Sequence, residues 1–180
     1  MNRGHTFKLV YLSTLSALAV ALHAVEALIP VPYIFPGAKL GLANVVAVHV
    51  IYTYGLVEGL VVTGVRTVLG SLLGGFLLGA TFILSAAGGL ASTAVMGVLV
   101  VTGRERLSPV GVSVVGAITH NVAQLVAAGL ITRQPALVYY LPALLAFGLP
   151  TGVLVGLISL RLKPLEGLIR SLLGPGESGS

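Results

Sequence analysis

The sequence predicts an all-α integral membrane protein, built as a bundle of six transmembrane helices. Of its 180 residues, 56% are hydrophobic and only 8% are charged, and the mean hydropathy is +1.05. A soluble domain carries about 25% charged residues, so this composition is typical of a chain in a lipid bilayer. A transmembrane helix needs about 20 apolar residues, and six such spans with short loops use nearly the whole chain. We therefore expect one membrane domain over residues 1–165 and a polar, disordered tail over residues 166–180.

Prolines, glycines and charged clusters set the boundaries of the expected spans. Three prolines in IPVPYIFPG, residues 29–37, end the first span, and YTYGLVEG at 52–59 separates the second from the third. TGRERLSP and TRQP separate the fourth, fifth and sixth spans. The hairpin at 75–81 is so apolar that the sequence leaves open whether it crosses to the outer surface. The expected spans are residues 8–29, 39–54, 57–75, 82–102, 108–131 and 137–162.

The distribution of lysine and arginine predicts the orientation of the bundle. Basic residues are enriched in the cytoplasmic loops of membrane proteins. With both termini on one side, that side collects seven basic residues: Arg3, Lys8, Arg104, Arg106, Arg161, Lys163 and Arg170. The other side collects only Lys39 and Arg133. We therefore expect a multi-pass protein of the cell membrane with both termini in the cytoplasm.

Polar side chains inside the expected spans are candidates for a binding site. A charged residue near the bilayer centre costs roughly 2.5–3.5 kcal/mol on insertion scales, so such residues mark function. Arg66 lies nine residues after the start of its span, about 14 Å into the membrane, and His120 lies about 18 Å into its own. Since these groups cluster in the middle and outer half, we predict a pocket open to the outside, between the first, second, fifth and sixth helices. Its predicted substrate-binding residues are Glu26, Lys39, Asn44, Arg66, His120, Asn121 and Gln124.

Several of these residues also have a simpler interpretation. Lys39 would equally serve to reach the outer headgroups with its long side chain. Glu26 would equally serve only to pair with Lys39 or Arg66, and Arg66 would then belong to a structural ion pair. His120 alone would be an ordinary core histidine, but the high density of polar residues in HNVAQ, residues 120–124, favours a polar pocket.

Small residues recur at helical spacing in three spans and predict close helix packing. Ser13, Ala17 and Ala21 form such a stripe in the first span. Gly70 and Gly74 form one in the third span, and the sixth span carries Gly148, Gly152 and Gly156. Small residues let helix backbones approach closely in lipid, where no hydrophobic effect drives association. We expect the stripes of the third and sixth spans to pack inside the bundle.

Residues that are missing exclude several kinds of chemistry. The chain has no cysteine and no aspartate, so it has neither a thiol nucleophile nor an aspartate-rich magnesium site. It has no GxxxxGK[ST], HExxH or GxSxG motif, and its histidines lack metal-ligand spacing. We therefore expect no catalytic residue, no metal and no cofactor, and the motifs favour a protein that is not itself an enzyme. The net charge of +5 is scattered and does not indicate nucleic-acid binding.

Five motifs, in order along nearly the whole chain, resemble one known family. They are PGAKLGLANVV, RTVLGSLLGG, SAAGGLAS, HNVAQL and YYLPALLAFGLPTG. The chain resembles the Gx transporter family, also named heptaprenyl diphosphate synthase component I. That family is similar in size and layout to the substrate-binding S components of energy-coupling factor (ECF) transporters. The resemblance implies a six-helix bundle of that type, a partner coupling subunit in the membrane and two cytoplasmic ATPases. It also implies that Ser13, Ala17 and Ala21 contact the coupling subunit.

The leading hypothesis is thus a membrane subunit that binds a small anionic solute from outside. Lys39 and Arg66 would neutralise the anion, and His120, Asn121 and Gln124 would hydrogen-bond the rest of the solute. The alternative is a noncatalytic membrane partner in polyprenyl diphosphate synthesis, since prenyl synthases bind magnesium diphosphate with aspartates that this chain lacks. A third reading is a membrane scaffold without a ligand. The sequence does not identify the solute or the oligomeric state.

Overall fold

The structure, a computed structural model, describes residues 3–28, 41–103 and 107–173. These residues form six α-helices and one 3-10 helix, and they contain no strand. The helices are α1 (Arg3–Leu28), α2 (Leu42–Tyr54), α3 (Leu56–Leu73), α4 (Ala80–Gly103), α5 (Pro109–Thr132), η2 (Pro135–Tyr140) and α6 (Leu141–Leu173). The all-α class is confirmed. Lys39, one of the predicted substrate-binding residues, lies outside the described residues.

Within the described ranges, five segments are long and apolar enough to cross a membrane, which makes the protein a multi-pass membrane protein. They are Gly4–Glu26, Leu56–Leu73, Ala80–Gly103, Pro109–Thr132 and Pro135–Leu162. The remaining helix, α2, has 13 residues and is about 20 Å long, shorter than the roughly 30 Å hydrocarbon core. The count of six complete spans therefore stays a prediction, as does the side on which the termini lie.

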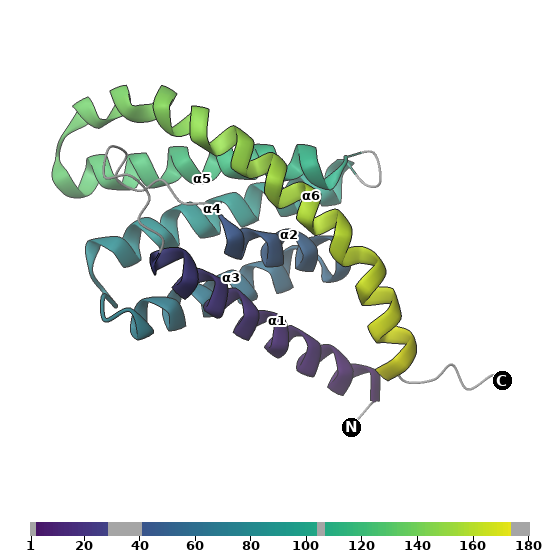
Figure 1. The fold of residues 1–180 in the computed structure, drawn as a ribbon. Coiled ribbons are helices and arrows are strands. Elements are labelled where there is room, and N and C mark those ends of the chain that lie inside the picture. Colours follow the sequence, from purple (N-terminus) through teal and green to yellow (C-terminus); the bar gives the residue numbers. More distant parts are fainter. Residues whose placement is uncertain (1–2, 29–40, 104–106, 174–180) are drawn as a thin grey trace.

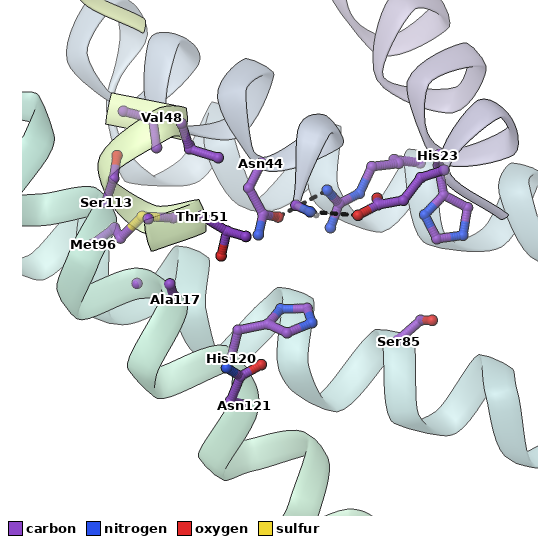
Figure 2. A pocket seen from close by; sticks show the side chains of 16 residues that line it. His23, Asn44, Val48, Ser85, Met96, Ser113, Ala117, His120, Asn121 and Thr151 are labelled. Atoms are coloured by element: carbon purple, nitrogen blue, oxygen red, sulfur yellow. Dashed lines mark hydrogen bonds between the residues drawn. The ribbon is translucent and has the colours of Figure 1, made fainter. Parts of the chain in front are cut away.

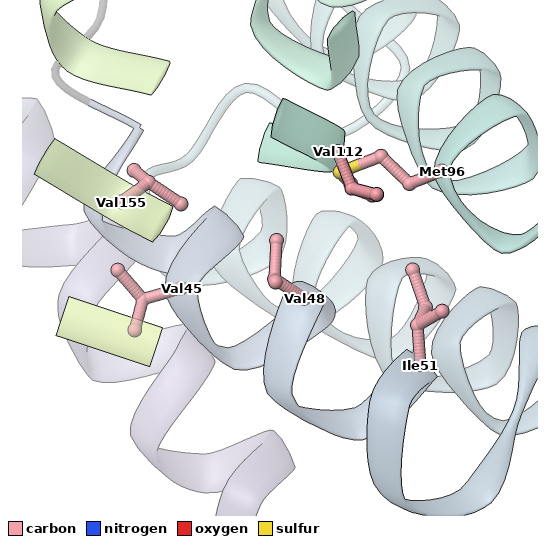
Figure 3. Close-up of a cluster of buried hydrophobic side chains, with 6 residues drawn as sticks. All are labelled: Val45, Val48, Ile51, Met96, Val112 and Val155. Atoms are coloured by element: carbon pink, nitrogen blue, oxygen red, sulfur yellow. The ribbon is translucent and has the colours of Figure 1, made fainter. Parts of the chain in front are cut away.

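The helix α2 occupies the centre of the bundle. It packs against α1, α3, α4 and α6, and all but one of its residues from Ala43 to Ile51 are buried. One apolar cluster joins α2 to α4, α5 and α6, as Figure 3 shows, through Val45, Val48, Ile51, Met96, Val112 and Val155. A second cluster joins it to α1 and α3 through Leu15, Ala19, Val46, Val50 and Val62. A helix enclosed by protein on this scale does not need the full thickness of the bilayer.

The sixth helix is longer than expected. It was predicted to end near residue 162, with a disordered tail from 166, but α6 continues to Leu173. Pro164 lies inside this helix, and a single proline interrupts only one backbone hydrogen bond. The residues that follow are rich in leucine, with glutamate and arginine, all good helix formers, so the helix continues. The first helix also begins earlier than predicted, at Arg3 rather than residue 8.

Glycines on α6 let it pack closely against α5, as the sequence predicted. A methyl group on Gly152 would lie 2.9 Å from the Val114 Cα atom and 3.1 Å from the Ser113 carbonyl oxygen. One on Gly156 would lie 3.0 Å from the Pro109 carbonyl oxygen. The neighbours are backbone atoms, which cannot rotate away. This contact holds together the two helices that supply one wall of the site described below.

Side-chain bonds join several helix ends at one end of the bundle. The Lys8 ammonium lies 2.6 Å from a carboxylate oxygen of Glu58, so the beginnings of α1 and α3 are neighbours. The Tyr52 hydroxyl donates to the Leu107 carbonyl oxygen at 2.9 Å, which links the end of α2 to the segment before α5. Figure 1 shows the beginning of α1 and the last turns of α6 at the same end of the molecule. The described ends of α1 and α6 therefore lie near one another, and the placement of both termini in the cytoplasm stays a prediction.

Candidate functional site

A small polar cavity of about 40 Å³ lies in the interior of the bundle. All six α-helices contribute to its lining, whereas the sequence predicted walls from the first, second, fifth and sixth helices only. The space is about that of three water molecules, at 10–15 Å³ each. Figure 2 shows the side chains around it. The polar lining residues are His23, Glu26, Asn44, Arg66, Ser85, Ser113, His120, Asn121 and Thr151.

Arg66 is the positively charged side chain among the described residues that line this cavity. It is 5% exposed on α3, and its Nη1 donates to the Asn44 side-chain oxygen at 3.0 Å. The Arg66 Nε is buried and has no hydrogen-bond partner among the described residues. An unsatisfied buried donor costs about 1–3 kcal/mol, and more when the group is charged. The guanidinium is therefore held in place by Asn44 and still has a donor to offer.

Glu26 places a negative charge near the Arg66 guanidinium. Its side chain is 6% exposed near the end of α1, and its charge interacts favourably with Arg66. One carboxylate oxygen also accepts a hydrogen bond from the Gly41 backbone N–H. Gly41 has a φ of 71°, a conformation that suits glycine, directly before α2. Glu26 thus connects α1 to the start of α2 and partly balances the charge of Arg66.

Three glycines make room for the ionisable side chains at the cavity. A methyl group on Gly88 would lie 2.9 Å from the His120 ring, and one on Gly89 would lie 3.0 Å from Arg66 Nη2. A methyl group on Gly70 would lie 2.6 Å from the His23 ring. The Gly88–Gly89 pair does not interrupt α4, which is one continuous α-helix. Its glycines instead leave space for side chains from α3 and α5.

The predicted residues of α5 differ in their positions. His120 and Asn121 both line the cavity, and the Asn121 amide donates to the Leu144 carbonyl oxygen of α6 at 2.9 Å. Gln124 is 6% exposed but is not among the lining residues. The structure therefore brings Glu26, Asn44, Arg66, His120 and Asn121 around one cavity, and leaves Gln124 to one side.

Four polar lining residues were not among the predicted site residues: His23, Ser85, Ser113 and Thr151. Two of them carried a signal in the sequence, because His23 shares a helical face with Glu26 and Ser113 lies seven residues before His120. The Ser113 hydroxyl is 2% exposed and has no hydrogen-bond partner among the described residues. Ser85 and Thr151 carried no such signal. In the described part of the chain, no group of three or more His, Asp or Glu side chains is placed to hold a metal ion.

Comparison with known families gives a match over most of the chain. A family model described as heptaprenyl diphosphate synthase component I matches residues 15–162. This is the family that the five motifs predicted. Neither the curated proteins nor the solved structures contain a match.

Proposed function

The chain belongs to the heptaprenyl diphosphate synthase component I family, and on that premise we propose that it is a membrane-embedded, solute-binding subunit of the S type. It binds a small anionic solute in the central cavity and depends on other proteins for energy. The observation that carries this proposal is the buried Arg66 guanidinium beside a cavity lined by all six helices. Intramembrane charges are costly, face internal or water-filled space and mark solute pathways.

Buried polar atoms without a hydrogen-bond partner among the described residues support binding of a polar solute. Arg66 Nε and the Ser113 hydroxyl both lie at the cavity and are both without a partner among the described residues. Buried polar groups are otherwise nearly always hydrogen-bonded, so each such exception requires an explanation. An anionic group that accepts from Arg66 Nε would satisfy the more costly of the two. Lys39 is proposed to neutralise the anion together with Arg66, while His120 and Asn121 contact the rest of the solute and Gln124 supports them.

The exposed face of α1 supports a partner within the membrane. Ser13, Ala17 and Ala21 are all exposed, whereas Leu15 and Ala19 on the other face are buried. The small-residue stripe of α1 is thus not packed against the part of the chain that the structure describes. We propose that it contacts a transmembrane coupling subunit, which is driven by two cytoplasmic ATPases.

A second candidate function rests on the description of the family. It names a component of heptaprenyl diphosphate synthase, which favours a role as the membrane partner of a prenyl-transferring enzyme. The chain has no aspartate, so the magnesium diphosphate chemistry would belong to the other component. In this arrangement Arg66 and Lys39 would meet a diphosphate rather than an imported solute.

Co-purification distinguishes the two candidates. The tagged protein, extracted from its native membrane in mild detergent, is expected to carry a coupling subunit and two ATPases. Ala17→Leu is expected to lower their recovery roughly tenfold, because overpacking a close contact costs about 1–3 kcal/mol. Ala146→Leu, at an exposed alanine of α6, is the matched control. Recovery of a soluble prenyl synthase in place of the ATPases would support the second candidate and contradict the first.

Gly88→Ala tests the role of His120 in the same cavity. The added methyl group would displace the His120 ring, which is the movable end of a side chain, so the free energy of unfolding should change by less than about 1 kcal/mol. Loss of one hydrogen bond to the solute should weaken its binding roughly two- to tenfold. Isothermal titration with the solute that copurifies with the protein measures this effect. If the His120 ring is displaced in Gly88→Ala and the solute affinity is unchanged, His120 does not contact the solute.

A further inference from the structure

A second hollow in the protein is an apolar groove between α5 and the beginning of the sixth span. Its volume is about 230 Å³, several times that of the central cavity. Val122, Leu125, Val126 and Gly129 of α5 form one side, and Leu137 and Leu141 lie opposite. Apart from Gln134, no lining residue has a polar side chain. The groove shares no lining residue with the polar cavity.

The groove runs along the membrane-spanning part of α5. Val122 and Gly129 are seven residues apart, so it extends about 10 Å along the helix axis. That length covers roughly two thirds of one leaflet of a 30 Å hydrocarbon core. Val126 and Val138 are 57% and 56% exposed, so the groove opens on the outer surface of the bundle, where lipid lies. Since an apolar cavity of about 150 Å³ stays dry and admits benzene, a groove of this size and chemistry accepts hydrocarbon.

The dimensions of the groove favour a single chain over a helix. The groove extends only about 10 Å along α5, so a helix with a pitch of 5.4 Å would contact it over less than two turns. A helix of a second copy or of another protein would therefore lie across the opening without filling it. One extended hydrocarbon chain is narrow enough to enter.

The residues at the end of the groove favour an anionic headgroup. Arg133 is exposed, follows α5 directly and is adjacent to the lining residue Gln134. Tyr139 and Tyr140 are 84% and 47% exposed on the same short segment, and such tyrosines prefer the membrane–water interface. A positive charge at the interface attracts a phosphate headgroup, while the groove runs from there toward the bilayer interior.

We propose that this groove binds one acyl chain of an anionic phospholipid of the surrounding bilayer, whose headgroup phosphate meets Arg133. The site holds α5 and η2 in contact through a bound lipid rather than through side chains alone. It is separate from the solute site, so its occupancy does not depend on the proposed transport role.

Native mass spectrometry tests the proposal with two lipids of identical acyl chains. The protein is equilibrated with an equal mixture of phosphatidylglycerol and phosphatidylcholine and then released from the detergent. We expect one retained phosphatidylglycerol per chain, preferred about fivefold because one arginine near the interface favours one anionic lipid to that extent. Val126→Trp should remove the bound lipid by filling the groove, whereas Val115→Trp, on the same helix outside the groove, should not.

Arg133→Gln provides an independent test, because Arg133 is exposed and lies outside the helices. It should abolish the preference for phosphatidylglycerol while lipid is still retained, and Arg161→Gln should leave the preference unchanged. This comparison decides the matter even if the Val126 variant does not fold. Equal lipid retention by wild type and Val126→Trp, or an unchanged preference in Arg133→Gln, would overturn the proposal. So would a wild-type dimer that carries no lipid and that Val126→Trp converts to a monomer.

Discussion

Replacing Arg66 with glutamine is expected to weaken solute binding by at least about 30-fold. In the proposed complex, Arg66 is the positively charged described residue at the cavity, where Asn44 holds it, and it pairs with the anionic group of the solute. Truncating one partner of such a buried, hydrogen-bonded charge pair costs about 2–5 kcal/mol. The variant removes the free Nε–H donor and leaves Glu26 without its opposite charge. Arg66→Lys should fall in between, because lysine keeps the charge but not the planar set of donors. Titration calorimetry on the purified protein, with the copurifying solute, measures the three affinities.

The same substitutions separate a binding site from a purely structural ion pair. If Arg66 only stabilises the bundle, then Arg66→Leu should be harmless or stabilising, as replacing a buried ion pair by apolar residues often is. Binding should then also survive Lys39→Ala. A solute affinity unchanged by both Arg66→Gln and Lys39→Ala would show that the electrostatic roles assigned to these residues are wrong.

Gly152→Ala is expected to destabilise the bundle by about 1–3 kcal/mol. The new methyl group would lie 2.9 Å from the Val114 Cα atom, so α5 and α6 would have to separate along their contact. Alanine's higher helix propensity, worth about 1 kcal/mol, offsets only part of this cost. Thermal unfolding in detergent, followed by circular dichroism, measures the change. Solute binding should weaken as well, since Ser113, Asn121 and Thr151 all lie on the two helices that would move.

Gly64→Ala is the matched control for this substitution. Gly64 lies in the middle of α3 and has open space around it, with nothing within 4 Å of an added methyl group. This variant should be neutral or up to about 1 kcal/mol more stable. Equal stability of the Gly152 and Gly64 variants would contradict the close packing of α5 against α6.

Much of the fold could be predicted from composition and from breaks in the apolar pattern. The long spans carry strong, continuous hydropathy, and Ser108 and Pro109 mark the start of α5 within one residue of the prediction. The end of α6 could not be predicted, because a proline at 164 indicates a stop and only the surroundings decide whether the helix continues. The burial of α2 was equally hidden, because enclosure by protein rather than lipid is a property of the assembled bundle, whereas its shortness was already present in the predicted span of residues 39–54.

The candidate site could be predicted where a charged or strongly polar side chain, which costs free energy to place in a membrane, lies in an apolar span. Glu26, Asn44, Arg66, His120 and Asn121 were found in this way, and the structure places all five at one cavity. Ser85 and Thr151 were missed because hydroxyl side chains are common in membrane helices, where they bond to their own backbone, as Thr151 does to Gly148.

The contribution of α4 was missed for a different reason. Its glycines at 88 and 89 create space instead of supplying a polar group, so they give no signal of a site until the opposite helices are placed. Only then are they seen to accommodate Arg66 and His120.

Native mass spectrometry of the freshly extracted protein tests the central claim most directly. If the six-helix cavity is a solute site, each wild-type chain should retain one small anionic molecule, and Arg66→Gln should lose it while remaining folded. Wild-type protein that carries no such molecule, and that shows no binding or stabilisation with small anionic metabolites from the same cells, would contradict the account.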